Sequence, residues 1–368
     1  MTIQLHHAQV QVRIEIKQIT GGEMNFHNCF IGRKTTFLVL ALLSFVASTG
    51  FAEGVSARLR YSKRMSEAFV LEANISADSK TLITLNGDLT VGLWDLQTGK
   101  LFKSLTGHQG RLMKVSVSAD GRLLATGAFS KDKVKIWDMA TGRLIGEMAI
   151  FDELASLALS SDGKLLAASG VNSGKTRDCA VELWDIAKGT RIAVLAKKPV
   201  EQFYPGYLRF SPDGRHLAAG IQNRLHSIMI WDVTTNKLLK TIPHPGDIGA
   251  IDYSPDGSKL AGGGVGNSAC VWDAQTGKLL LQMKGHTDFI TGISFHPAGR
   301  YFATTSFGSK SRFRIWDTQT GKQAFAQEGR ARTNNLVFSN DGKSLAVVIT
   351  TYGNLGDPAT LEVYDINL

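Results

Sequence analysis

The sequence predicts an all-β protein built from seven copies of one four-stranded antiparallel unit. Three observations support this fold class. A short apolar strand that ends in an aromatic residue and an aspartate recurs along the chain. A turn tetrad of the Ser-x-Asp-Gly type precedes each copy of that strand. Glycine supplies 38 of the 368 residues, which suits a chain with many tight turns.

The aromatic-Asp strand is the most regular element of the repeat. Its copy at 134–143, VKIWDMATGR, alternates apolar and other residues before the tryptophan, which is the period of a half-buried strand. Successive aromatic residues lie 41 to 48 residues apart, and a period of this length indicates an array of supersecondary units. We expect a structural role for all seven pairs, which are Trp94/Asp95, Trp137/Asp138, Trp184/Asp185, Trp231/Asp232, Trp272/Asp273, Trp316/Asp317 and Tyr364/Asp365.

Two turns frame each copy. The fifth residue after the tryptophan is Gly99, Gly142, Gly189, Asn236, Gly277 or Gly321. Glycine, and next asparagine, tolerate positive φ, so we expect a hairpin closed by a left-handed residue. The other turn begins at Ser76, Ser118, Ser160, Ser211, Ser254, His296 or Ser339. Each unit therefore consists of strand, turn, strand, loop, Trp-Asp strand, turn and strand.

At these residues the chain resembles the WD-repeat (WD40) family over about residues 55–368. The resemblance implies a seven-bladed β-propeller of four-stranded antiparallel blades around a central channel. The last copy ends four residues after Tyr364, before an outer strand could form. We expect the strand-like segment VSARLRY, residues 55–61, to complete that last blade and so close the ring.

The resemblance also implies a buried network of a histidine, a Ser or Thr, an Asp six residues before the Trp, and the indole. His108, His244 and His286 hold the histidine position, but Lys131, Gly266 and Lys310 hold the Asp position of those blades. Asp88 has the right spacing before Trp94, yet Ser66 replaces the histidine there. We therefore expect no complete network, three structural histidines, and stability that rests on apolar packing between blades.

The N-terminal region has a different composition from the repeats. The run FLVLALLSFVA, residues 37–47, follows Arg33 and Lys34 and precedes small residues, as in a secretory signal. We expect a signal region at 1–52, a true start at Met24, cleavage after Ala52, and a propeller at 53–368 in the periplasm or outside the cell. The alternative is an uncleaved membrane anchor; the mature form would have no span.

Charge and composition favour a protein partner over nucleic acid. Loss of residues 1–52 removes four Lys/Arg and two Asp/Glu and lowers the net charge from +9 to +7. The remaining basic residues are spread over all repeats, without a dense run. Cys179 and Cys270 lie in non-adjacent repeats, so we expect two buried thiols and no disulfide.

The sequence contains no convincing catalytic motif. The segment SGVNSGKT, residues 169–176, lacks the first glycine of a phosphate loop and precedes a strand instead of a helix. No GxSxG, HExxH or CxxC is present. We therefore expect no catalytic residue, no cofactor and no metal, and a monomeric propeller.

The insertions between repeats are the best candidates for binding. The span from turn glycine to aromatic residue is 15 to 17 residues in most repeats, but 21 in the third and 22 in the seventh. The added loops and the segment EQFYPGY supply the candidate contact residues Asn172, Lys175, Arg177, Phe203, Tyr204, Tyr207, Tyr352, Asn354 and Asp357. We expect an exported, non-catalytic protein- or peptide-binding scaffold. The alternatives are a small-ligand or enzyme site in the channel, and an envelope-associated structural module.

Overall fold

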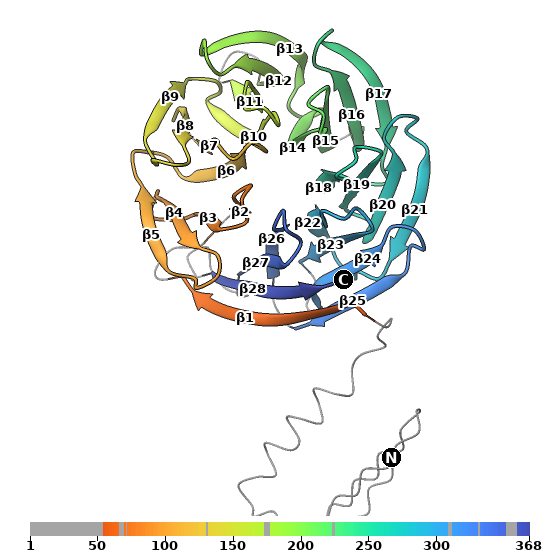
Figure 1. Cartoon of the computed structure of the whole chain (residues 1–368). Coiled ribbons are helices and arrows are strands. Elements are labelled where there is room, and N and C mark those ends of the chain that lie inside the picture. Colours follow the sequence, from red (N-terminus) through yellow and green to blue (C-terminus); the bar gives the residue numbers. More distant parts are fainter. Residues whose placement is uncertain are drawn as a thin grey trace, which may run out of the picture. The chain divides into compact units, whose positions relative to one another are not determined.

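The computed structural model describes residues 54–65, 70, 72–129, 132–172, 177–222, 225–307, 311–329, 332–350 and 359–368. Within these ranges, seven four-stranded antiparallel sheets are arranged as blades around a central axis (Figure 1). The all-β, seven-bladed prediction is confirmed. No helix in these ranges has the length and apolar character needed to cross a bilayer.

Each blade runs from an inner first strand to an outer fourth strand. Blade 1 contains β2 (Ala73–Ile75), β3 (Thr81–Leu85), β4 (Val91–Asp95) and β5 (Leu101–Leu105). Blade 2 contains β6 (Leu112–Val117), β7 (Leu123–Ala128), β8 (Val134–Asp138) and β9 (Leu144–Met148). Blade 3 contains β10 (Glu153–Leu159), β11 (Leu165–Asn172), β12 (Asp178–Asp185) and β13 (Thr190–Pro199). Blade 4 contains β14 (Tyr204–Phe210), β15 (His216–Gln222), β16 (Ser227–Asp232) and β17 (Lys237–Pro243).

The remaining blades repeat the same order. Blade 5 contains β18 (Ile248–Tyr253), β19 (Lys259–Gly264), β20 (Ser268–Asp273) and β21 (Leu279–Lys284). Blade 6 contains β22 (Ile290–Phe295), β23 (Tyr301–Ser306), β24 (Ser311–Asp317) and β25 (Gln323–Glu328). Blade 7 contains β26 (Arg332–Phe338), β27 (Ser344–Thr350), β28 (Thr360–Asn367) and, from the other end of the chain, β1 (Ser56–Arg64).

The ring is closed by β1, as the sequence predicts. β1 pairs antiparallel with β28 from Ser56 opposite Asn367 to Arg64 opposite Thr360 (Figure 1). Side chains of β1 also reach blade 1: the Tyr61 hydroxyl donates to the Leu96 carbonyl at 3.1 Å, and Lys63 Nζ donates to the Gly99 carbonyl at 2.9 Å. The closing strand therefore holds blade 7 together and fixes blade 7 against blade 1.

The turns have the backbone conformation that the sequence requires. All six residues at the fifth position after tryptophan have positive φ, including Asn236 at 59°. The aspartate that follows the tryptophan explains this geometry, because its carboxylate accepts backbone amides inside the turn. Asp138, for example, accepts the Thr141 amide at 2.8 Å and the Thr141 hydroxyl at 2.6 Å.

Asp365 is the exception among the repeat aspartates. Its strand, β28, continues past it to Asn367, so its carboxylate does not cap a hairpin of the kind that follows the other six. Its side chain is 49% exposed and accepts from Arg60 Nε of β1 at 2.8 Å. Arg60 also donates through Nη2 to the Ser344 hydroxyl at 3.1 Å. Asp365 therefore helps to fasten the closing strand instead of capping a hairpin.

The core is divided among the blade interfaces. Seven hydrophobic clusters combine side chains of neighbouring blades, one cluster for each interface of the ring. The repeat aromatics are buried, except Trp184, which is partly buried. Cys179 and Cys270 are buried free thiols, as predicted. Apolar area removed from water between blades, at about 25 cal/mol per Å², is the general source of ring stability.

Candidate partner-binding face and central channel

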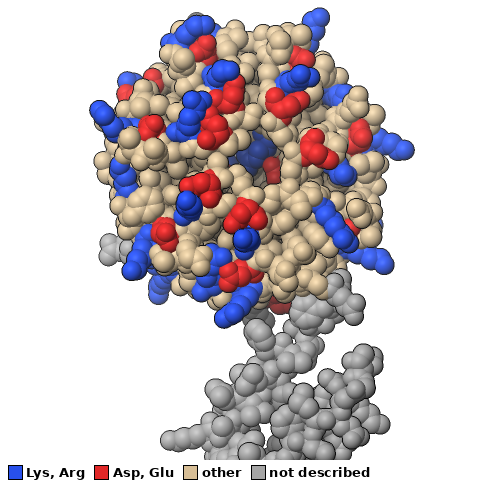
Figure 2. Space-filling model, in the orientation of Figure 1, with Lys and Arg blue, Asp and Glu red and all other residues tan. Residues whose placement is uncertain are grey.

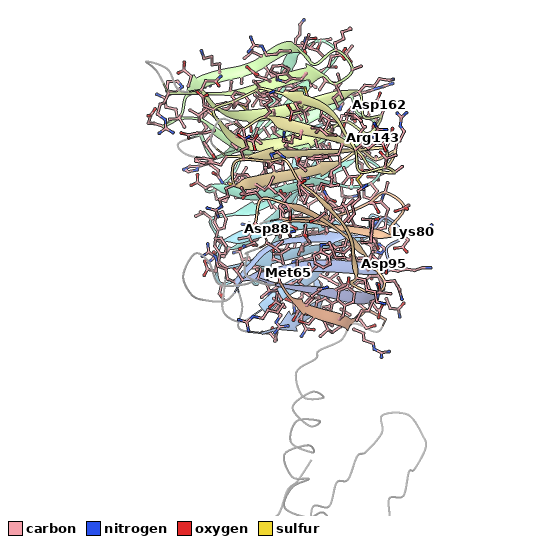
Figure 3. All side chains as sticks on the ribbon, turned by 90° about the vertical axis from the view of Figure 1, so that its left-hand side faces the viewer. Met65, Lys80, Asp88, Asp95, Arg143 and Asp162 are labelled. Atoms are coloured by element: carbon pink, nitrogen blue, oxygen red, sulfur yellow. The ribbon has the colours of Figure 1, made fainter. Side chains whose placement is uncertain are left out.

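The propeller has two faces with different connections. The loop face carries the connections between second and third strands and those between blades; the turn face carries the remaining turns. Figure 3 shows this separation: Asp88, between β3 and β4, lies on one side of the blades, and Lys80 and Asp95 lie on the other. Figure 2 looks onto the turn face, where acidic and basic side chains are interspersed around a hollowed centre.

Three predicted contact residues come together on the loop face between blades 3 and 4. Asn172 and Arg177 are exposed at the two ends of the β11–β12 connection. The Asn172 side-chain oxygen accepts the Asp152 amide at 3.3 Å, and Arg177 Nη2 lies 2.8 Å from Glu153 Oε2. Tyr204 is half-buried beside them. Burial raises the pKa of its phenol, the charge of Glu153 raises this pKa further, and the charge of Arg177 lowers it.

The other predicted contact residues have different placements. Phe203 has no exposed surface and packs in the cluster between blades 3 and 4, so it offers no surface for direct contact with a partner. Lys175, Tyr352, Asn354 and Asp357 lie outside the residues that the structure describes. Tyr207 is half-buried on β14 and lines the central channel.

The channel contains a partly enclosed cavity of about 210 Å³. Six blades contribute to its lining, and six of the lining residues carry its chemistry: Glu72, Lys114, Tyr207, Arg209, Phe289 and Asn334. Lys114 Nζ lies 4.9 Å from the centroid of the Tyr207 ring. Burial raises the pKa of Tyr207 to about 12, and the Glu72 carboxylate adds to this rise. Blades 5 and 6 contribute the small residues Ala250 and Gly292, which leave the space open.

Polar side chains of the inner strands join one blade to the next. At six of the seven interfaces, such a side chain accepts a backbone amide of the following blade at 2.8 to 3.2 Å. The pairs are Glu72 to Val115, Ser116 to Leu159, Ser156 to Leu208, Asp252 to Phe295, Ser294 to Phe338 and Asn335 to Ala73. Between blades 4 and 5, Arg209 Nε instead lies 3.8 Å from Asp252 Oδ1. These polar side chains thus hold neighbouring blades together.

Blade 2 has the complete buried network that we did not expect from the sequence. Trp137 Nε1 donates to the Thr126 hydroxyl at 2.8 Å, and that hydroxyl lies 2.8 Å from His108 Nε2. His108 Nδ1 lies 2.8 Å from Asp132 Oδ2. The prediction was wrong because it required an Asp six residues before Trp137, where Lys131 stands. Asp132, one residue later, reaches the histidine.

Electrostatics support a neutral histidine in this network. Burial lowers the pKa of His108 despite the neighbouring Asp132 carboxylate. Burial also opposes ionisation of Asp132, but hydrogen bonds from His108 and from the amides of Gln109 and Gly110 outweigh it, so the Asp132 pKa lies below its ordinary value. His108 therefore donates through Nδ1 to the carboxylate and accepts at Nε2 from Thr126.

The other blades have variants of this arrangement. In blade 6, the Thr304 hydroxyl joins His286 Nε2 at 2.6 Å to Trp316 Nε1 at 2.8 Å, and burial lowers the pKa of His286 to about 3. In blade 5, His244 Nε2 has no hydrogen-bond partner among the described residues, and its ring lies 6.0 Å from that of Trp272. All three histidines therefore have the buried, structural placement that the sequence predicts.

Blades 3 and 7 use a buried glutamate in place of the threonine. Glu182 accepts the Trp184 indole at 3.1 Å and pairs with Arg191 at 2.6 Å. Glu362 accepts the Tyr364 hydroxyl at 2.5 Å and a guanidinium nitrogen of Arg312 at 2.7 Å. Each glutamate lies two residues before the repeat aromatic, so this spacing was the sequence signal that could have predicted the variant.

The channel residues also follow a sequence pattern that we did not predict. Six lining residues lie four residues before the turn that begins at Ser76, Ser118 or an equivalent residue, and they are Glu72, Lys114, Tyr207, Ala250, Gly292 and Asn335. In β14, Arg209 two residues before the turn lines the cavity as well as Tyr207. Because side chains alternate along a strand, these two positions share one side, and that side borders the channel. Polar residues at these positions in otherwise apolar strands were the available signal.

The repeat of this chain matches the model of a known protein family in three places. The family model of the WD domain, G-beta repeat, matches residues 99–138, 236–273 and 277–317. Each match ends at a Trp-Asp pair and begins at the turn before an outer strand, so it includes strands of two neighbouring blades.

Three relatives are similar to this chain over longer stretches than the family model matches. The chain is 27% identical over 296 residues to the small ribosomal subunit protein RACK1 of Caenorhabditis elegans, which covers 73% of this chain and 85% of that protein. It is 26% identical over 244 residues to autophagy-related protein 16 of Arabidopsis thaliana, covering 66% and only 37% respectively. It is 25% identical over 252 residues to the serine-threonine kinase receptor-associated protein of Dictyostelium discoideum, covering 67% and 79%.

Proposed function

Because the chain belongs to the WD-repeat family of β-propellers, we propose that it is a non-catalytic scaffold that binds a protein or peptide partner through its loop face. Two relatives are named for a larger assembly or an association, one with the small ribosomal subunit and one with a kinase receptor. A closed ring whose blades are joined by buried clusters is a rigid support for surface residues. Fold alone does not define function, and the residues of the loop face supply the further support.

The observation that carries the proposal is the convergence of Asn172, Arg177 and Tyr204 beside one blade interface. Two of these side chains are exposed, and the third is half-buried with an aromatic surface. They come from the lengthened β11–β12 connection and from the start of β14, on the same face. An arginine and a tyrosine at the edge of a rigid interface are residue types favoured in protein contacts.

The alternative of an enzyme in the channel has less support. Glu72, Ser116 and Asp252, the kinds of group that could serve as acid, nucleophile or base, accept backbone amides of the next blade. No group of three or more metal-ligating side chains occurs in the part of the chain that the structure describes. The cavity of about 210 Å³ is smaller than the roughly 300–1,000 Å³ of sites for small-molecule ligands.

We also propose that the protein acts after export. The apolar run at 37–47 and the small residues before Glu53 support a leader that is removed after Ala52. N-terminal sequencing of the protein recovered from a periplasmic or culture fraction should begin at Glu53. An intact N-terminus on protein from the cytoplasmic fraction would refute export.

Affinity capture tests the binding face. The full chain serves as bait for an envelope fraction, beside an Asn172→Ala/Arg177→Ala variant and an Arg143→Ala control. Arg143 is exposed on the turn face (Figure 3), so its loss should leave capture unchanged. The double variant should lose most of the captured partner while keeping the urea midpoint of the wild type. Equal capture by all three proteins would exclude this face.

A further inference from the structure

Among the described residues that line the channel cavity, the Lys114 ammonium forms no direct ion pair with a carboxylate. The ammonium lies over the Tyr207 ring, and it has no other interaction with the described residues. Two other ionic groups of the cavity have polar partners. One Glu72 oxygen accepts the Val115 amide at 3.1 Å, and Arg209 Nε lies 3.8 Å from Asp252.

The cavity also has an aromatic side. Phe289 and Phe307 are stacked at its border with ring centroids 5.6 Å apart and an interplanar angle of 21°. The guanidinium of Arg332 lies 4.1 Å from the Phe307 ring centroid. Basic groups of the protein itself thus already cover one face of Tyr207 and one face of Phe307, and a partner's cation would meet these like charges.

The size of the cavity restricts what can enter. The volume of about 210 Å³ lies below the roughly 300–1,000 Å³ of small-molecule sites, which leaves space for the end of a side chain. The lining offers an ammonium from Lys114 and an amide from Asn334 beside an apolar surface. A carboxylate that accepts from either group would gain a hydrogen bond, which is charge-assisted where Lys114 is the donor.

We propose that the channel cavity binds the carboxylate of one acidic side chain, with Lys114 as its counter-charge and the Phe289–Phe307 pair receiving an adjacent aromatic side chain of the same peptide. This rests on the proposed function, because it names the chemistry of the partner segment. A carboxylate fits better than a phosphate: Glu72 borders the cavity and Asp252 Oδ1 lies 3.8 Å from Arg209 Nε, and both carboxylates would repel a dianion more strongly than a single negative charge.

Three labelled peptides test the assignment with the full chain: Gly-Ser-Phe-Glu-Gly-Ser, a form with glutamine in place of glutamate, and a form with phosphoserine there. Fluorescence anisotropy should give at least tenfold tighter binding, or about 1.4 kcal/mol, for the glutamate peptide than for either other peptide. The preference should weaken as salt is added.

Two variants locate the effect. Lys114→Met keeps the aliphatic stem and should abolish the preference for glutamate while leaving weak binding of the glutamine peptide. Lys164→Met removes an exposed lysine of a turn between first and second strands and should keep the preference. Equal binding of the glutamate and glutamine peptides, no binding of any peptide, tighter binding of phosphoserine, or an unchanged preference in Lys114→Met would each overturn the proposal. The capture experiment on Asn172 and Arg177 uses a different readout. Failure of the cavity proposal would appear in the peptide titrations, and failure of the proposed binding face would appear in the capture experiment.

Discussion

Replacement of Thr126 by valine should destabilise the propeller more than a change of similar size elsewhere in blade 2. The Thr126 side chain is fully buried, and its hydroxyl joins Trp137 Nε1 to His108 Nε2. Valine keeps the volume but removes the hydroxyl. It leaves one donor and one acceptor without partners in a buried site.

The expected magnitude follows from these two lost partners. A buried polar group left without a hydrogen bond costs roughly 1–3 kcal/mol, so the loss of two partners in Thr126→Val should cost roughly 2–6 kcal/mol. Thr126→Ser is the matched control. It keeps the hydroxyl and loses one methyl group, which costs about 1 kcal/mol.

Urea denaturation followed by tryptophan fluorescence provides the assay, with wild type, Thr126→Val and Thr126→Ser compared at pH 7. The midpoint should fall in the order wild type, serine, valine. A valine variant as stable as the serine variant would refute the reasoning. It would show that the network contributes little and that apolar packing alone supports this blade.

Three other contacts give testable outcomes. Burial raises the pKa of Asp252 to about 6, although its side chain is 24% exposed, so the folded state holds a proton that the unfolded chain releases. The free energy of unfolding should therefore fall by roughly 1–2 kcal/mol as pH rises from 4 to 7. Asp252→Asn should remove this pH dependence of the urea midpoint, and an unchanged dependence would contradict the assignment. Glu362→Gln should lower Tm more than Glu182→Gln does. Arg312, the partner of Glu362, is 30% exposed, whereas Arg191, the partner of Glu182, is 50% exposed, so water compensates less for the charge that Arg312 loses. A larger fall of Tm for Glu182→Gln in calorimetry would exclude this cause. Deletion of residues 54–64 should expose the edge of β28 and produce concentration-dependent association in light scattering, which a synthetic 56–64 peptide should suppress; a monodisperse deletion variant would argue against the role of β1 in protecting the edge.

The blade count and the closure were predictable because they depend on local, repeated chemistry. The aromatic-Asp pairs fix the number of units, and the positive-φ residues such as Gly142 and Asn236 fix the hairpins. The segment at 55–61 could be assigned to the last blade because that blade lacked a strand. The observed β1 extends three residues further, to Arg64. Asp365 has a different role from the other repeat aspartates because its neighbour in space is Arg60 of this closing strand.

The network and the channel were harder to predict because they depend on how loops and blades approach one another. Asp132 reaches His108 across 24 positions in the sequence, and a fixed spacing rule pointed to Lys131 instead. Phe203 looked like an exposed anchor in an aromatic segment, but β14 begins at the next residue and its packing against blade 3 buries the ring. The channel cavity combines residues from six blades, so no single repeat reveals it.

The pairing of Ser56 with Asn367 also makes this protein suitable for circular permutation. Paired residues of antiparallel strands are about 5 Å apart, so a linker of a few residues could join the two ends without disturbing β1 or β28. New ends could then be opened in any short connection between other blades, on whichever side of the disc an attached reporter is wanted. The blade that combines strands from both ends of the chain would then be a different one, while the order of the sheets around the axis stayed the same.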